Sequence, residues 1–338
     1  KKDEDPPLRM SSDSSKAVEF VLEKQSWLCP TVPADRPITI RNLLTHTSGL
    51  DYSGLVEEVT TPLEGVIRQL VERCERGEVA CLADWVAEMA KMPLRHQPGT
   101  RYEYSYSLDV LGRIVEILGG KSLDQILQER VFTPLGMRST GFATSQEDAQ
   151  HRLAALYDLR VDEKRKVSHE LLDDPLSSLW VPPRGPAPIL GGGGGVETLR
   201  GGLLSTVPDY MRFCLMLQSG GELDGRRILH ENTVKLMTEV NHLDELAVEG
   251  PGGCGKGKSS DGFGWGLLGT IELSDAERKD EPSFFPGLCG WGGWASTCFR
   301  IHPESGLAYV FMTNCCGINF ENRIHKRLRQ ALRLGSNR

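Results

Sequence analysis

Three separate groups of residues in this sequence carry the side chains that serine acyl transfer requires. Serines cluster just before Lys16, Tyr104-Ser105-Tyr106 lies in a predicted turn, and Trp291-Gly292-Gly293 opens a strand-like segment. A serine hydroxyl is a poor nucleophile near neutral pH, so it must lose its proton to a neighbouring base as it attacks. A lysine with a depressed pKa and a tyrosine can carry out these proton transfers. The residue types therefore predict a serine site that works without histidine.

The composition excludes several functional classes. The chain has 338 residues, of which 39% are hydrophobic and 25% charged, as in one large globular domain or two closely packed ones. Its formal net charge of -7 argues against a nucleic-acid partner, which would favour a basic surface. No apolar run approaches about eighteen residues and the first residues are polar, so we expect no membrane span and no signal peptide. A soluble protein, cytoplasmic by default, is the resulting expectation.

Neither metal nor cofactor is expected. The nine cysteines have irregular spacings without a C-x-x-C pair, and the eight histidines form no H-E-x-x-H motif. We interpret most cysteines as small buried apolar residues. The segment Gly252–Ser259 matches the phosphate-binding pattern G-x-x-x-x-G-K-[ST], but no apolar strand precedes it and no helix follows. We therefore interpret it as a surface loop.

Helical periodicity dominates the first half of the chain. A cap and a first-turn proline at Thr61-Pro62 begin a helix that carries Val66, Ile67, Leu70 and Val71 on one face. Further helices are predicted at Cys81–Met92, at Ser107–Leu118, and from a capping box at Ser122 to a stop at Pro134 and Gly136. The expected buried face of the helix at Ser107–Leu118 is Leu108, Leu111, Ile114, Val115 and Leu118.

Strand-like segments appear in the second half. Thr206 and Asp209 predict a helix start, with Met211, Cys214, Leu215 and Leu217 facing inward. Short runs separated by glycine and proline turns predict an antiparallel meander at Phe263–Leu268, Thr297–Ile301 and Leu307–Thr313. An amphipathic helix at Asn319–Leu334 is expected to lie on that sheet.

Several segments resemble one known family in the same order along the chain. Ile38–Leu50, which reads I-T-I-R-N-L-L-T-H-T-S-G-L, resembles the signature of the serine β-lactamase-like superfamily. This group includes class C β-lactamases, D-Ala-D-Ala carboxypeptidases among the penicillin-binding proteins, and esterases. Tyr104–Gly112 is similar to its tyrosine motif, and Ser122–Met137 and Gly201–Gly225 are similar to later blocks. The resemblance runs from about Pro33 to Val310.

The resemblance implies an α/β fold of the α+β type, in which an antiparallel sheet flanked by helices joins a mostly helical subdomain. It implies a single domain at 1–338, with the helical part at about 10–200 carrying the site serine, lysine and tyrosine and the sheet part at about 201–338. Only ten residues precede Ser11, and the helix at Val18–Gln25 is short for this family. Relative to a complete domain, we therefore expect N-terminal strands and part of the first helix to be missing.

The catalytic residues implied by the resemblance are Ser12, Lys16 and Tyr104. The family places serine three residues before lysine, but that position holds Asp13 here, and Ser12 precedes Lys16 by four. On a helix both spacings put the two side chains on one face. A working site with shifted geometry and a degraded motif both fit this spacing, just as Lys16 fits either a site lysine or an exposed helix charge.

Substrate contacts are implied for Trp291, Gly292, Gly293, Trp294 and Tyr106. Trp291-Gly292-Gly293 resembles the esterase variant of a motif that is Lys-Thr-Gly in lactamases, and Tyr106 stands where lactamases usually carry asparagine. Loss of that lysine removes a partner for a substrate carboxylate, which favours neutral, apolar acyl groups. The glycines leave room for a substrate beside the strand, and the Trp294 N–H is implied as half of an oxyanion hole.

Two functions of different classes stay open. The first is a serine hydrolase that acts on a small-molecule ester or amide through an acyl-enzyme, with an esterase favoured over a β-lactamase or a D-Ala-D-Ala carboxypeptidase. The second is a catalytically impaired relative with a scaffold, binding or self-assembly role, and a homo-oligomer is compatible with both. His46 is expected to serve in structural hydrogen bonding, because no Ser-His-Asp order supports a catalytic role. Trp265, Trp291 and Trp294 fit either an acyl pocket or the core.

Overall fold

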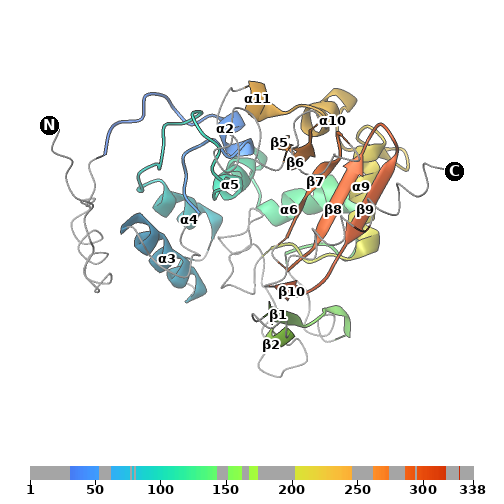
Figure 1. Ribbon diagram of the computed structural model, residues 1–338, viewed down its shortest axis with the longest axis horizontal. Helices are drawn as coiled ribbons and strands as arrows, with labels where there is room; N and C mark the ends of the chain where they lie inside the picture. Colours follow the sequence, from blue (N-terminus) through green and yellow to red (C-terminus); the bar gives the residue numbers. More distant parts are fainter. Residues whose placement is uncertain are drawn as a thin grey trace.

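The computed structural model describes residues 31–52, 62–76, 78–79, 81–142, 151–161, 167–173, 202–245, 262–273, 286–293, 295–316 and 327. Within these ranges, the helices between residues 40 and 119 gather on one side of the molecule (Figure 1). A five-stranded antiparallel sheet lies on the other side. This arrangement confirms the predicted α+β fold.

The helical side is built around one apolar core. Its helices are α2 (Ile40–Leu44), α3 (Pro62–Glu75), α4 (Leu82–Met89) and α5 (Ser107–Gly119). The core consists of Ile67, Leu70, Val71, Val79, Leu82, Trp85, Met89, Tyr106, Leu123 and Phe142. Burial of each large apolar side chain stabilises the fold by roughly 1.5–3 kcal/mol. The predicted inward face of α3 is confirmed, because Val66, Ile67, Leu70 and Val71 are all buried.

Helix α5 has nearly the predicted bounds but buries a different face. Its buried residues are Ser107, Asp109 and Gly112, whereas Val115 and Leu118 are 37% and 80% exposed. A Cβ at Gly112 would lie 3.1 Å from a methyl carbon of Leu82 and 3.2 Å from one of Leu123. The prediction was wrong for Val115 and Leu118 because α5 packs through its small and polar residues, which allow neighbouring elements to approach closely.

The helical run after α5 begins and ends at local signals. Ser122 and Gln125 form the predicted capping box at the start of α6 (Leu123–Leu127). A π-helical turn, η2 (Gln128–Phe132), and α7 (Thr133–Leu135) continue the run to Gly136, whose φ is +69°. Gly136 is therefore confirmed as the end. Pro134 does not stop the run, because it lies in the first turn of α7, where its missing N–H is not needed.

The sheet follows the order β5-β6-β7-β8-β9, with every neighbouring pair antiparallel, and confirms the predicted meander. Its strands are β5 (Phe263–Trp265), β6 (Thr270–Glu272), β7 (Cys289–Gly292), β8 (Cys298–His302) and β9 (Leu307–Phe311). Helix α9 (Val207–Gln218) starts at the predicted Thr206 cap and packs against β8 and β9 (Figure 1). The inward position of Leu215 was predicted wrongly: this side chain is 41% exposed, and Met216 is buried instead.

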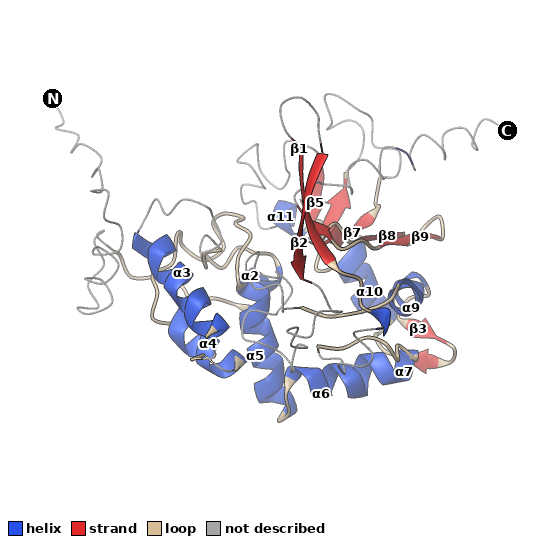
Figure 2. Cartoon of the chain, turned by 90° about the horizontal axis from the view of Figure 1, so that it is seen from below, coloured by secondary structure: helices blue, strands red, loops and turns tan. Residues whose placement is uncertain are grey.

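Smaller elements complete the described part of the chain. They are β1 (Leu156–Val161), β2 (Val167–Asp173), β3 (Glu222–Leu223), β4 (Arg226–Arg227), α10 (Glu231–Thr238), α11 (His242–Glu245) and β10 (Cys315–Cys316). Strand β1 pairs antiparallel with β2 and parallel with β10. This hairpin was not predicted from the sequence. Viewed from below, α3, α4 and α5 form a group apart from β7, β8 and β9 (Figure 2).

Several predictions lie outside the described residues. These are Ser12, Lys16 and Trp294, the segment Gly252–Ser259, and the helix at Asn319–Leu334 apart from Arg327. No helix within the described ranges is long and apolar enough to cross a membrane. Four of the described cysteines are buried as predicted: Cys214, Cys289, Cys298 and Cys316.

Candidate functional site

Tyr104 and Trp291, which come from distant segments of the sequence, lie together. Their rings stack with centroids 5.6 Å apart and planes 25° apart. Trp265 of β5 meets Trp291 edge to face at 4.7 Å, and its Nε1 donates a hydrogen bond of 3.2 Å to the Leu44 carbonyl. The start of the sheet thus contacts both the tyrosine loop and the end of α2. Two of the predicted motifs are brought to one place by these contacts.

The loop that carries Tyr104 is held against a second loop, residues 45–52. The Arg95 N–H donates to the Gly49 carbonyl at 2.8 Å, and the Glu103 N–H donates to the His46 carbonyl at 2.8 Å. Gly49 has a φ of +85°, and a Cβ there would lie 2.3 Å from the His96 carbonyl oxygen. Glycine is therefore required at position 49 for the two loops to meet.

The environment of Tyr104 keeps its phenol protonated. Burial raises the pKa of Tyr104, a hydrogen bond from the Trp291 side chain lowers it, and the Asp109 carboxylate raises it. Asp109 lies in the first turn of α5 and is 2% exposed. Because the net shift is upward from an ordinary value near 10, the group is a neutral phenol at neutral pH. It can therefore donate a proton or a hydrogen bond before it accepts one.

Two further tyrosines extend the aromatic cluster from Tyr104 toward the helical core. Tyr52 contacts it edge to face with centroids 5.1 Å apart, and Tyr106 lies 4.8 Å from Tyr52. Tyr106 also contacts Trp85 at 5.1 Å and is fully buried in the helical core, so a substrate contact by Tyr106 stays a prediction. Sequence reasoning missed Tyr52, because no local signal distinguishes it from any other loop tyrosine.

The Trp-Gly-Gly segment ends in a tight turn between β7 and β8. The Gly293 N–H donates to the Thr297 carbonyl at 2.7 Å, and the Ser296 N–H donates to the Gly293 carbonyl at 3.0 Å. A Cβ at Gly293 would lie 2.3 Å from the Thr297 hydroxyl oxygen. A side chain at position 293 would therefore require the Thr297 hydroxyl to turn away, which is a packing reason for glycine beside the substrate access that the sequence analysis predicts. A substrate contact by Gly292 or Gly293 stays a prediction.

His46 has the structural hydrogen-bonding role that was predicted. Its Nδ1 accepts a hydrogen bond of 3.2 Å from the Ser105 backbone N–H. The Ser105 hydroxyl shares a hydrogen bond of 2.8 Å with the Ser107 hydroxyl, which shares another of 2.7 Å with the Ser48 hydroxyl. Burial lowers the pKa of His46 to about 3, so the ring is neutral. Since Nδ1 accepts, the ring proton is on Nε2.

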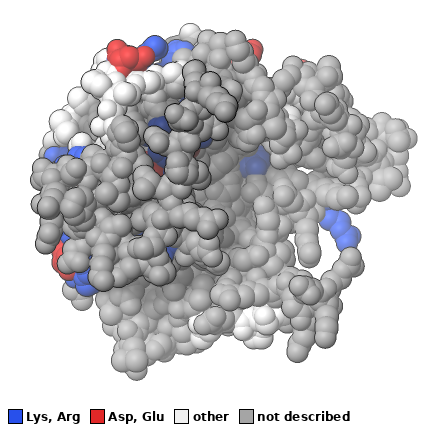
Figure 3. Space-filling model, turned by 60° about the vertical axis from the view of Figure 1, so that its left-hand side comes forward, with Lys and Arg blue, Asp and Glu red and all other residues white. Residues whose placement is uncertain are grey.

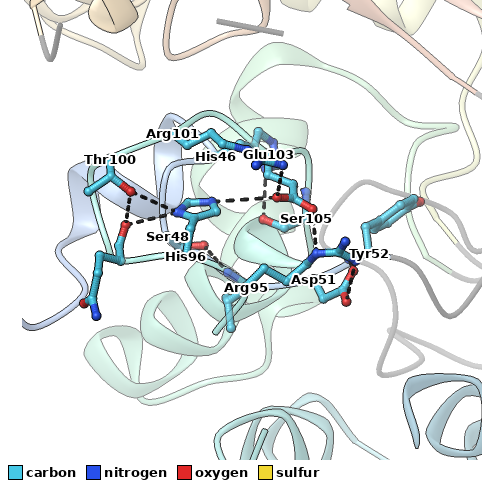
Figure 4. Close-up of polar contacts among 12 residues, drawn as sticks. His46, Ser48, Asp51, Tyr52, Arg95, His96, Thr100, Arg101, Glu103 and Ser105 are labelled. Carbon is cyan, nitrogen blue, oxygen red and sulfur yellow. Dashed lines mark hydrogen bonds and ion pairs between the residues drawn. The ribbon is translucent and has the colours of Figure 1, made fainter. Parts of the chain in front are cut away.

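Beside the site, one arginine joins three carboxylates. Figure 4 shows it with two of them, Asp51 and Glu103. Arg95 lies 3.1 Å from Asp51, 3.7 Å from Glu64 of α3 and 3.0 Å from Glu103, the residue before Tyr104. Burial lowers the pKa of Arg95, but the three carboxylates outweigh it and raise the pKa. Sequence reasoning missed this network, because its members are dispersed along the chain and only the tertiary fold brings them together.

Charged side chains near α3 and α4 pair on the surface. Arg76 lies 2.6 Å from Glu78, and Lys91 lies 2.9 Å from Glu88. Figure 3, in which that side of the molecule comes forward, shows described acidic and basic side chains next to one another. Solvent screening leaves such exposed pairs little effect on the stability of the fold. Among the described residues, no group of three or more His, Cys, Asp or Glu could hold a metal ion.

Comparison with known proteins identifies the family. A family model described as Beta-lactamase matches residues 24–333. The chain belongs to the beta-lactamase family. Protein Rv1367c of Mycobacterium tuberculosis is 36% identical over 293 residues, which cover 85% of this chain and 64% of that protein. Esterase EstB of Burkholderia gladioli is 26% identical over 288 residues, which cover 82% of this chain and 64% of that protein.

A solved structure agrees with this assignment at the level of the fold. EstCE1, described as a hydrolase with promiscuous acyltransferase activity, superposes with a TM-score of 0.60 at 24% identity, covering 94% of this chain and 81% of that chain. The predicted superfamily and fold are thus confirmed. Rv1367c and EstB are longer than this beta-lactamase family chain, which spans 64% of the length of each.

The structure brings together only part of the predicted site of this beta-lactamase family member. Tyr104 and Trp291 are in contact, Gly292 ends the strand that carries Trp291, and Gly293 lies in the turn that follows. Ser12, Lys16 and Trp294 lie outside the described residues, so their roles stay predictions. What the described part can supply is a protonated phenol, positioned by aromatic rings beside the edge of the glycine turn.

Proposed function

We propose that this chain is a serine acyl hydrolase, and specifically an esterase that acts on neutral, apolar small-molecule esters. The observation that carries the proposal is the stacking of Tyr104 on Trp291. The protonated Tyr104 phenol lies beside the indole of Trp291, and Trp291 stands at the position where lactamases carry a lysine. An acyl group that enters next to these rings meets apolar surface and a hydrogen-bond donor, and Trp291 offers no cation to a substrate carboxylate.

The proposed reaction has two steps. The Ser12 oxygen attacks the ester carbonyl carbon while its proton passes to the Lys16 amine, and the carbon–alkoxide bond breaks as Tyr104 gives its proton to the leaving oxygen. The resulting phenolate recovers a proton from the Lys16 ammonium. Water then attacks the acyl-enzyme, the acid leaves, and the Ser12 hydroxyl is restored. The Trp294 N–H and the N–H of Ser12 are proposed to hold the transient oxyanion.

The named relatives support acyl chemistry of this kind. EstB is named an esterase, and EstCE1 is described as a hydrolase with promiscuous acyltransferase activity. Both descriptions involve transfer of an acyl group, to water in hydrolysis and to another acceptor in acyl transfer. We therefore propose ester hydrolysis as the main reaction, with transfer to an alcohol as a side reaction.

Covalent labelling tests the proposal directly. The chain is treated with a fluorophosphonate probe, the labelled peptide is mapped by mass spectrometry, and hydrolysis of p-nitrophenyl butyrate is followed. We expect one label on Ser12, loss of the label and of turnover in Ser12→Ala, and a loss of about 100-fold or more in Tyr104→Phe. Ser14→Ala is the matched control and keeps both. A folded sample with neither label nor turnover would contradict the proposal.

A second function is favoured by one sequence observation. Asp13 occupies the position of the serine in the S-x-x-K motif, as it would in a catalytically impaired relative with a scaffold or self-assembly role. Light scattering of wild type and a Ser12→Ala, Tyr104→Phe double variant distinguishes the two functions. Equal assembly of both proteins, without esterase activity in either, is the outcome that the scaffold role requires.

A further inference from the structure

His46 contacts Tyr104 and both of its neighbours in the chain. Its carbonyl accepts the N–H of Glu103, the residue before Tyr104, at 2.8 Å. Its Nδ1 accepts the N–H of Ser105, the residue after Tyr104, at 3.2 Å. Between these two bonds, the imidazole ring lies against the phenol ring with centroids 4.5 Å apart and planes tilted by 34°. One side chain and its own backbone thus fix the peptide on each side of Tyr104 as well as its ring.

We infer that His46 is a positioning residue that fixes the direction of the Tyr104 hydroxyl. This inference rests on the proposed function, in which that hydroxyl transfers a proton. A rotation of the phenol ring moves its oxygen through a wide arc, and a misplacement of about 1 Å can cost about 100-fold in rate. The hydrogen bonds from the Glu103 and Ser105 N–H groups fix the backbone position from which the Tyr104 ring projects. The imidazole contact limits how far that ring can turn.

The backbone of His46 is strained in a way that serves this geometry. Its φ is +52°, a left-handed conformation that histidine adopts only uncommonly. In this conformation the carbonyl and the ring of the same residue both reach the Tyr104 segment. Such a conformation costs free energy by itself, and it persists only where the surrounding structure imposes it. The contacts of the His46 carbonyl and ring with the Tyr104 segment therefore account for this backbone conformation.

A ring contact with Trp265 adds a second constraint on His46. Its Nε2, which carries the proton, has no hydrogen-bond partner among the described residues. Trp265 lies edge to face with the imidazole at 5.2 Å and in turn contacts Trp291 at 4.7 Å. His46 and Trp291 therefore both lie against Tyr104 and are themselves joined through Trp265. The position of Tyr104 is coupled in this way to the first strands of the sheet.

Substitutions at His46 separate positioning from general packing. His46→Asn keeps a side-chain acceptor for the Ser105 N–H and tolerates the left-handed φ, but it removes the ring from Tyr104. His302→Asn is the matched control, because His302 is also buried and bonded through both ring nitrogens, to Ser305 and to the Pro286 carbonyl. Each variant is measured for esterase kcat and KM. The Tyr104 signal is followed by NMR of protein labelled at tyrosine Cζ, assigned with Tyr104→Phe.

We expect His46→Asn to lower kcat by about 10- to 100-fold, to leave KM within about twofold, and to shift or broaden the Tyr104 signal. His302→Asn lowers the melting temperature but leaves kcat and the Tyr104 signal as in the wild type. A His46→Asn protein with wild-type kcat and an unchanged Tyr104 signal would overturn the inference.

Two further results keep the inference separate from the proposed function. If the wild type shows no esterase activity, the proposed function fails, but an unchanged Tyr104 signal in His46→Asn still overturns the positioning role and a shifted one supports it. If His46→Asn does not fold, the wild type is tested for a nuclear Overhauser contact between the His46 and Tyr104 ring protons. A wild type that lacks this contact overturns the inference, and one that shows it supports the inference.

Discussion

The rings of Tyr104 and Trp291 stack with centroids 5.6 Å apart and planes 25° apart, and the Trp291 side chain lowers the pKa of the Tyr104 phenol against the effect of burial. The contact joins β7 of the sheet to the loop before α5, so the phenol proposed to transfer protons lies against the strand that leads into the glycine turn. A substitution in this strand is therefore expected to affect the phenol without any change in the tyrosine loop.

Replacement of Trp291 by phenylalanine keeps an aromatic ring against Tyr104 but removes the indole N–H. Burial raises the pKa of Tyr104 and the Trp291 side chain lowers it, so loss of the N–H is expected to raise the pKa further. We expect the alkaline limb of the pH profile of kcat to move to higher pH and the rate at neutral pH to fall about tenfold. Trp265→Phe is the control, because its indole N–H bonds to Leu44 instead. An unmoved limb in Trp291→Phe would show that Trp291 does not govern the phenol.

Elements with local signals were predicted well from the sequence. The capping box at Ser122, the Thr206 cap and the glycine at 136 each depend on contacts within a few residues, and all three are confirmed. The meander of short strands was also recognisable, since the turns between its strands carry glycine and proline. The tyrosine motif and the Trp-Gly-Gly segment could be named as parts of one site by resemblance, and the structure brings Tyr104 and Trp291 into contact.

Features that depend on distant contacts could not be predicted. The buried face of α5 follows Gly112, where Leu82 and Leu123 approach the backbone, so its apolar periodicity wrongly included Val115 and Leu118. Strands β1 and β2 pair with each other, and β1 takes its second neighbour from residues 315–316 near the far end of the chain. The ion pairs of Arg95 likewise join the loop at residues 95–106 to the loop at residues 45–52 and to α3. In each case the decisive partner lies outside the sequence window that a local pattern covers.

Removal of Arg95 tests what its three carboxylates contribute. Asp51 and Glu64 are 3% and 6% exposed, so Arg95→Met takes a cation away from two buried carboxylates and from Glu103. We expect the free energy of unfolding in urea to fall by about 1–3 kcal/mol. Arg101→Met is the control, because Arg101 also contacts Glu103, at 3.1 Å, but is 54% exposed. Its expected loss is at most about 0.5 kcal/mol. Equal losses in the two variants would show that burial of the carboxylates does not matter.

The stability of the protein is expected to fall in mild acid because of His46. The ring ionises near 6.5 in an unfolded chain, and burial lowers the pKa to about 3 in the folded one. Between these values the unfolded chain binds more protons, so the free energy of unfolding decreases as the pH falls. From pH 7 to pH 5 the loss from His46 alone is about 2 kcal/mol.

Comparison with His46→Asn separates this loss from the titration of carboxylates. Urea unfolding is measured for both proteins at several values between pH 7 and pH 5. Asparagine does not titrate, so the variant, although less stable at pH 7, is expected to lose about 2 kcal/mol less than the wild type on acidification. Parallel losses in the two proteins would mean that His46 is not held neutral in the folded state.

Substitution of Gly49 tests whether the close approach of the two loops is required. In Gly49→Ala the new Cβ would lie 2.3 Å from the His96 carbonyl oxygen, at a φ of +85°. Gly225→Ala is the matched control, because its φ is +73° but nothing lies within 4 Å of the added carbon. The left-handed conformation alone costs roughly 1–2 kcal/mol, which is the loss expected for Gly225→Ala. Gly49→Ala must in addition push residues 95–106 away, so we expect a loss of at least about 3 kcal/mol in urea unfolding together with lower esterase activity, since Tyr104 lies on the displaced loop. Similar stability in the two variants, with unchanged activity in Gly49→Ala, would show that the loops can separate without disturbing the site.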